Sequence, residues 1–126
     1  MVDAPDDGTQ SAPPALLRVL YVDDDVGPRT TFNFVFRDLM TLTTVSSAQE
    51  ALQELRKNRY DAVITDQRMP EMPGDELLRK VYEDDPTIVR VILSCFSDRE
   101  EILHAYNDGH CEYYTDKRVL STPSVF

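Results

Sequence analysis

Residues 60–74 read YDAVITDQRMPEMPG and contain the clearest structural signal in the chain. Its β-branched, apolar run at residues 62–65 ends abruptly on Asp66, and a loop with two prolines and Gly74 follows. A short apolar run bounded by turn residues predicts a buried strand. Because this strand stops at Asp66, it presents the Asp66 carboxylate at its exit, which makes Asp66 the first candidate for a reactive group.

Strands and helices alternate along the rest of the chain. We expect four helices between five strands, which lie at residues 17–22, 41–45, 62–65, 88–94 and 112–115. Strands that alternate with helices form right-handed βαβ units around a parallel sheet that is covered on both faces. The sequence therefore predicts an α/β fold with a doubly wound, five-stranded parallel sheet.

Apolar residues recur at helical spacing in the first and third helices, which predicts the face that each helix buries. The predicted inward residues are Phe32, Val35, Phe36 and Leu39 in the first helix, and Leu77, Leu78, Val81 and Tyr82 in the third. The second helix is predicted to begin with a capping box, in which Ser47 precedes Glu50 by three residues. Ser97 and Glu100 predict a second capping box ahead of the fourth helix, with Gly109 after its end.

Composition limits the function classes. The chain has 126 residues, enough for one domain with a substantial core. Its formal net charge of −10 argues against direct binding of nucleic acid or anionic lipid, because contacts with phosphate groups supply most of such affinity. The charge is compatible with a bound cation or a basic partner surface.

No feature of the sequence predicts a membrane span or export. No segment approaches the roughly 18 apolar residues that a membrane span needs, and the N-terminus lacks the pattern of a signal peptide. Cys95 and Cys111 are too few for a disulfide framework, and we expect Cys95 to be a small buried residue. We therefore expect a cytoplasmic protein with a disordered tail at 1–15, a folded domain at 16–117 and a short C-terminal tail at 118–126.

Residues with chemical potential follow four of the predicted strands. Asp23 and Asp24 come after the first strand, Asp66 after the third, and Lys117 after the fifth, while Ser94 ends the fourth. In open parallel sheets the functional crevice lies outside the carboxyl ends of the strands. We therefore expect these five side chains to lie close together.

The expected cluster predicts phosphoryl chemistry. Carboxylates held close together repel one another unless a cation neutralises them, and oxygen ligands without Cys or His favour Mg²⁺. A carboxylate beside Mg²⁺ can accept a phosphoryl group, and Asp66 is the candidate. Lys117 would supply a second positive charge and Ser94 a hydrogen bond to the transferred group.

The chain resembles the response-regulator receiver domains of two-component signalling, the CheY-like family. The matching pieces are residues 22–25 (VDDD), 60–66 (YDAVITD), 68–70 (RMP), Gly74, 91–94 (VILS), Gly109 and Lys117. The resemblance implies a flavodoxin-like fold with strand order 2-1-3-4-5. Residues 106–117 are similar to receivers that are attached to output domains of the metal-dependent phosphodiesterase type.

The resemblance also implies roles for individual residues. Asp66 matches the phospho-acceptor, Asp24 the direct Mg²⁺ ligand, and Asp23 the ligand that acts through water, while the main-chain carbonyl of Arg68 matches a further ligand. Ser94 matches the switch residue.

By the same resemblance, Tyr114 matches the aromatic residue that changes rotamer with Ser94, and Lys117 matches the lysine of the family motif. The expected partners are a histidine kinase or phosphotransfer protein and an output domain or protein. The chain would be a phosphorelay switch that phosphorylates and dephosphorylates itself, rather than an enzyme.

The sequence departs from the family pattern after Lys117. Arg118 stands where the family usually has proline, and residues 118–126 are too short for the long fifth helix, which is therefore missing or replaced. Val119, Leu120, Val125 and Phe126 could cover the sheet face in another way, and an apolar face left open would favour a homodimer.

Two other functions remain open from the sequence. A pseudo-receiver would have the same fold but serve only as a docking module. A haloacid-dehalogenase-type phosphatase would use Asp23 as its nucleophile and leave Asp66 without a role.

Overall fold

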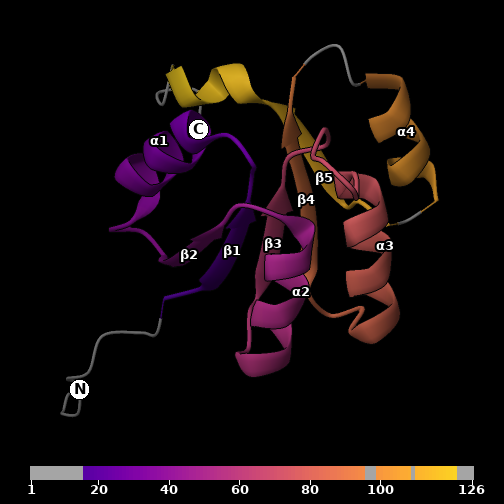
Figure 1. Ribbon diagram of the computed structural model, residues 1–126, viewed down its shortest axis with the longest axis horizontal. Coiled ribbons are helices and arrows are strands. Elements are labelled where there is room, and N and C mark those ends of the chain that lie inside the picture. The colour runs from indigo at the N-terminus through magenta and orange to yellow at the C-terminus, as the bar shows by residue number, and fades with distance from the viewer. Residues whose placement is uncertain (1–15, 96–98, 109, 122–126) are drawn as a thin grey trace, which may run out of the picture.

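The computed structural model describes residues 16–95, 99–108 and 110–121. Strands and helices alternate along this part of the chain (Figure 1). The strands are β1 (Arg18–Val22), β2 (Thr41–Val45), β3 (Ala62–Thr65), β4 (Val89–Ser94) and β5 (Tyr113–Asp116). The helices are α1 (Val26–Phe36), α2 (Ala48–Lys57), α3 (Gly74–Asp84), α4 (Arg99–Asn107) and the short 3₁₀ helix η2 (Lys117–Ser121).

All five strands are parallel, in the order β2-β1-β3-β4-β5. This confirms the predicted sheet and the order that the family resemblance implies. The register pairs Val22 with Thr65, Thr65 with Ile92, and Ser94 with Asp116. The carboxyl ends of β1, β3, β4 and β5 therefore lie along the same edge of the sheet.

Two hydrophobic cores lie on opposite faces of the sheet. The larger core contains buried residues of α2, α3 and α4, such as Ala51, Leu77 and Ile102. The smaller core joins Phe32 of α1 to strand residues and to Leu120 of η2, among others. In Figure 1, α1 and the yellow η2 segment lie near each other and apart from α2, α3 and α4.

The described chain replaces the long fifth helix of the expected fold with η2. Leu120 is buried against α1, so it covers part of that sheet face, which is one of the two outcomes that the sequence left open. The peptide bond between Lys117 and Arg118 is trans, like every other peptide bond of the described residues. The described helices include none with the length and apolar character that a membrane crossing requires.

Three residues expected to be buried are exposed. Helix α1 ends at Phe36, so Leu39 lies beyond it and is 66% exposed. Tyr82 of α3 is 42% exposed, and its ring contacts the Arg90 guanidinium, which lies 4.9 Å from the ring centroid. Cys95 lies just beyond the last residue of β4 and is exposed as well.

Several predictions lie outside the described residues. They concern Ser97, Gly109, Val125, Phe126 and the tail at 1–15.

Candidate functional site

Asp66 leaves the middle of the sheet, because β3 is flanked by β1 and β4. Its backbone N–H donates to the Val22 carbonyl at 2.8 Å, which extends the ladder by one residue. The loop then returns sharply, and the Gly74 N–H donates to the Gln67 carbonyl at 2.9 Å. A Cβ atom on Gly74 would overlap the Asp66 carbonyl oxygen, so only glycine fits this close approach.

The three consecutive aspartates after β1 have different environments. Asp23 is completely buried, whereas Asp24 is exposed. Asp25 is the N-cap of α1, and its Oδ1 accepts a hydrogen bond from the Gly27 N–H at 3.1 Å. Only Asp23 and Asp24 are therefore left to form the site, and the capping role of Asp25 explains the third acid.

Lys117 and Ser94 both reach Asp66. The Lys117 Nζ lies 3.1 Å from Asp66 Oδ1 and 2.8 Å from Asp23 Oδ2. The Ser94 hydroxyl donates to the same Oδ1 of Asp66 at 3.1 Å. Residues from the ends of four strands, which the sequence predicted to meet, thus form one cluster.

The cluster shifts the protonation equilibria of its members. Burial and the negative charge of Asp23 raise the pKa of Asp66 above its ordinary value, although Lys117 and Ser94 oppose this shift. Burial alone would lower the pKa of Lys117, but its hydrogen bond to Asp23 and the charges of both aspartates raise it. Lys117 is therefore a permanent cation beside two carboxylates.

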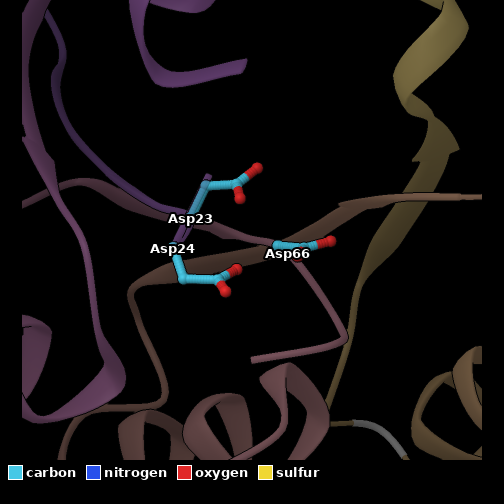
Figure 2. Close-up of side chains that lie close together, drawn as sticks. All are labelled: Asp23, Asp24 and Asp66. Atoms are coloured by element: carbon cyan, nitrogen blue, oxygen red, sulfur yellow. The ribbon is translucent and has the colours of Figure 1, made fainter. Parts of the chain in front are cut away.

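The acidic side chains fit a magnesium ion. Asp23, Asp24 and Asp66 each offer one carboxylate oxygen, and these three oxygens lie within 4.8 Å of one another (Figure 2). Ligand oxygens of an octahedral Mg²⁺ lie at most about 4.2 Å apart, since each Mg–O bond is about 2.1 Å. The spacing of the three oxygens therefore suits an ion that is held directly or through a water molecule, and Lys117 alone does not balance the charge of the three carboxylates.

The structure places the predicted switch residue Tyr114 close to Ser94. Both line a surface cavity of about 340 Å³ between α4 and β5, together with Ile102. The Tyr114 ring is 42% exposed and meets Tyr106 of α4 edge to face, with centroids 5.7 Å apart. Arg68 is exposed in the loop after β3, and its carbonyl stays a predicted ligand.

Two residues that contact the site, Tyr21 and Gln67, were not predicted from the sequence. Tyr21 donates its hydroxyl to Asp23 Oδ2 at 2.8 Å. The Gln67 N–H points to the Ser94 hydroxyl at 3.4 Å, and the Gln67 side chain exchanges two hydrogen bonds with Asp75 at the start of α3. The contact between Tyr21 and Asp23 could have been predicted, because residues two apart along a strand point to the same face.

The fold and this site define a class of signalling protein. The family model of the response regulator receiver domain matches residues 19–119. The chain therefore belongs to the response regulator receiver domain family. Receiver domains are signalling switches rather than metabolic enzymes, and they bind Mg²⁺ at an acidic pocket. The structure described here groups Asp23, Asp24 and Asp66.

The relatives of known description are regulators. The chain is 34% identical over 96 residues to the hydrogenase transcriptional regulatory protein HoxA of Cupriavidus necator. That alignment covers 76% of this chain and 20% of HoxA, so the chain spans about a fifth of this relative's length. Response regulators act with histidine kinases and output domains.

Solved receiver domains share the fold. A response regulator receiver domain protein from Clostridium thermocellum superimposes with a TM-score of 0.78 at 28% identity, over 87% of this chain and 90% of that one. The signal receiver domain of an HD domain-containing protein from Pseudomonas fluorescens Pf-5 gives a TM-score of 0.77 at 25% identity, over 86% and 81% of the two chains. These similarities confirm the receiver fold, and neither alternative function is better supported by them.

Proposed function

We propose that Asp66 accepts a phosphoryl group from the phosphohistidine of a histidine kinase or phosphotransfer protein. The observation that carries this proposal is the convergence of Lys117 and Ser94 on one oxygen of Asp66 beside two further aspartates. A lysine and a hydroxyl in these positions can neutralise the oxygens of a transferred phosphoryl group.

The contacts of Asp66 indicate which oxygen attacks. Within the described residues both donors reach Oδ1, so Oδ2 is the oxygen with its electron pairs available. In the transfer, Oδ2 forms a bond to phosphorus while the bond from phosphorus to the donor's imidazole nitrogen breaks. The electron pair of the broken bond stays on the imidazole, and the phosphoryl oxygens come within reach of Lys117 and Ser94.

Mg²⁺ would be held by Asp23, Asp24, Asp66 and the main-chain carbonyl of Arg68. When bound, the ion supplies positive charge that stabilises the transferring group. The side chains have separate tasks around it. Asp24, exposed at the rim, is available as a direct ligand, whereas the buried Asp23 keeps its hydrogen bonds and acts through water.

Phosphorylation would be transmitted to α4 and β5. Ser94 would transfer its hydrogen bond from Asp66 to a phosphoryl oxygen, which displaces it from its present position. The cavity that Ser94 and Tyr114 share offers space into which the Tyr114 ring can turn. The partner surface of the switch would then include Tyr106 and Tyr114, which pack edge to face.

The wider role of the chain follows from the family. The expected location is the cytoplasm, and the expected partners are a histidine kinase or phosphotransfer protein and an output domain or protein. The phosphodiesterase type of output stays a prediction. HoxA is a transcriptional regulatory protein, yet the charge of −10 makes this domain itself a poor ligand for DNA. Self-phosphorylation from small donors, self-dephosphorylation and a homodimer are further parts of the proposal.

Incubation with acetyl phosphate and Mg²⁺, followed by mass spectrometric mapping of the modified residue, tests the proposal. We expect a single label on Asp66 that hydrolyses over time. A label on Asp23 would support the phosphatase alternative instead. Absence of any label, together with no binding of Mg²⁺, would support the docking module.

A further inference from the structure

Tyr21 is a buried tyrosine whose hydroxyl points into the acidic site. The side chain has no exposed surface, and its hydroxyl donates to Asp23 Oδ2 at 2.8 Å. The ring stacks on Phe32 of α1, with centroids 4.4 Å apart and planes inclined by 19°. Because the ring is held between strand and helix, the position of the hydroxyl is fixed before any ligand binds.

The Asp23 carboxylate is oriented by three donors. Oδ2 accepts from the Tyr21 hydroxyl and from Lys117 Nζ, each at 2.8 Å. Oδ1 accepts from the Asp25 N–H at 3.0 Å. The three donors come from β1, from the start of η2 and from the loop before α1, so they fix the plane of the carboxylate as well as its position.

Lys117 is the least permanent of these donors. It is shared between Asp23 and Asp66, and in the proposed reaction the phosphoryl group on Asp66 also requires it. When Lys117 turns toward that group, the Tyr21 hydroxyl is, among the described residues, the side-chain donor that remains on Oδ2. Tyr21 can therefore keep Asp23 oriented through every state of the site.

We propose that Tyr21 is a positioning residue that orients the Asp23 carboxylate toward Mg²⁺. This inference rests on the proposed function, because it assumes that Mg²⁺ binds at Asp23, Asp24 and Asp66. Outer partners that orient metal ligands commonly change metal affinity by about 10- to 100-fold when they are removed. If Tyr21 only filled the core beneath α1, phenylalanine would serve equally well.

Tyr21→Phe removes the hydroxyl and keeps the ring that stacks on Phe32. We expect its dissociation constant for Mg²⁺ to rise about tenfold over that of the wild type. The constant is measured by competition against Mn²⁺, which is followed by electron paramagnetic resonance. Labelling by acetyl phosphate at limiting Mg²⁺ should slow by a similar factor and recover at saturating Mg²⁺.

Tyr60→Phe is the matched control. Tyr60 is 7% exposed, and its hydroxyl donates to the carboxylate of Glu54 at 2.7 Å, so the same chemical change is made at another buried tyrosine. Tyr60 belongs to the core on the opposite face of the sheet. We expect Tyr60→Phe to bind Mg²⁺ within about twofold of the wild type, because no metal ligand loses a donor.

Asp23→Asn shows whether Tyr21 acts through Asp23. If it does, adding Tyr21→Phe to Asp23→Asn should weaken Mg²⁺ binding no further. The inference is overturned if Tyr21→Phe binds Mg²⁺ as tightly as the wild type, or if its effect is the same with and without Asp23. A wild-type chain that binds no Mg²⁺ would overturn the proposed function, and this inference with it.

Discussion

Strand β3 carries an aspartate at each end, and the two differ in almost every property. Asp61, just before the strand, is exposed, and its Oδ2 accepts from the Arg18 N–H at 2.8 Å. Its own N–H donates to the Arg18 carbonyl, and its carbonyl accepts from Val89. Asp66, just after the strand, is 5% exposed and contacts Lys117 and Ser94.

The contrast shows that a position at a strand end does not by itself make a carboxylate reactive. Asp61 joins the starts of β1, β3 and β4, whereas Asp66 meets the charged side chains that β1 and β5 deliver. A cavity of about 430 Å³ lies at the Asp61 end, between α2 and α3, and it is larger than the cavity of about 340 Å³ beside Ser94. The convergence of charges, rather than the size of a cavity, therefore locates the site.

The largest expected effect is the loss of phosphorylation. Asp66→Asn should abolish labelling by acetyl phosphate, because it replaces the nucleophilic carboxylate with a neutral amide. Asp61→Asn should label like the wild type, with a stability loss of about 1 kcal/mol from its weakened hydrogen bond. Phosphate-affinity electrophoresis measures both variants, and loss of labelling in Asp61→Asn would remove the distinction between the two ends.

Two backbone segments approach each other closely at the Asp66 end, and an added methyl group tests this. Gly74→Ala should destabilise the fold by about 3 kcal/mol, since its Cβ would meet the Asp66 carbonyl. Gly27→Ala is the control, because its Cβ would lie at an ordinary 3.7 Å from Asp25 Oδ1. Urea unfolding compares the two, and equal midpoints would contradict the close approach.

Mg²⁺ should stabilise the domain by binding at the Asp66 end of β3 and not at the Asp61 end. At a concentration 100 times the dissociation constant, the ion should add about 2.7 kcal/mol to the free energy of unfolding. Asp24→Ala should remove most of this gain, whereas Asp61→Ala should keep it. Thermal unfolding with Mg²⁺ and with EDTA measures the difference, and a gain that survives Asp24→Ala would place the ion elsewhere.

The smallest effect is a difference in pH dependence. In EDTA, the raised pKa of Asp66 means that its contribution to stability is present below about pH 3.9, the unfolded value, and is lost as pH rises through the folded pKa. Asp66→Asn should therefore gain stability relative to the wild type as pH rises. Urea unfolding in EDTA, repeated across this pH range, measures the change.

Asp85, at the other end of the sheet, should give the opposite sign. Hydrogen bonds from the Thr87 hydroxyl and N–H lower the pKa of Asp85, so its contribution is present above about pH 3.9 and is lost as pH falls through the folded pKa. Asp85→Asn should therefore lose stability relative to the wild type as pH rises. The same trend in both variants would contradict the assigned environments.

Much of the fold could be predicted because local signals agreed with the tertiary structure. The bounds of β2 and β3 are those that the apolar runs predicted, and Ser47 caps α2 as expected. In the second hydrogen bond of that capping box, the Glu50 carboxylate accepts from the Ser46 N–H rather than from the Ser47 N–H. Leu39 was misplaced because periodicity continued past Phe36, where the helix itself ends.

The candidate site could be predicted down to which residues meet, since parallel strands bring their carboxyl ends to one edge. The hydrogen bonds of the site could not be predicted from the sequence, because they depend on rotamers and on distances between chain segments far apart in sequence. The sequence showed no reason for Lys117 to bond to Asp23 as well as to Asp66. The sequence also gave no indication that Gln67 and Asp75 form two hydrogen bonds with each other.

Strand β5 passes directly into η2, with Asp116 ending one and Lys117 beginning the other. Lys117, the cation of the site, is thus the first residue of a short helix. Near the other end of this helix, Leu120 packs against α1. The side chain of the neighbouring Arg118 is 80% exposed, so a fluorophore attached at this position would lie on η2 next to Lys117. With Cys95→Ser and Arg118→Cys for labelling, the fluorescence would test whether metal and phosphoryl donors change the surroundings of Lys117.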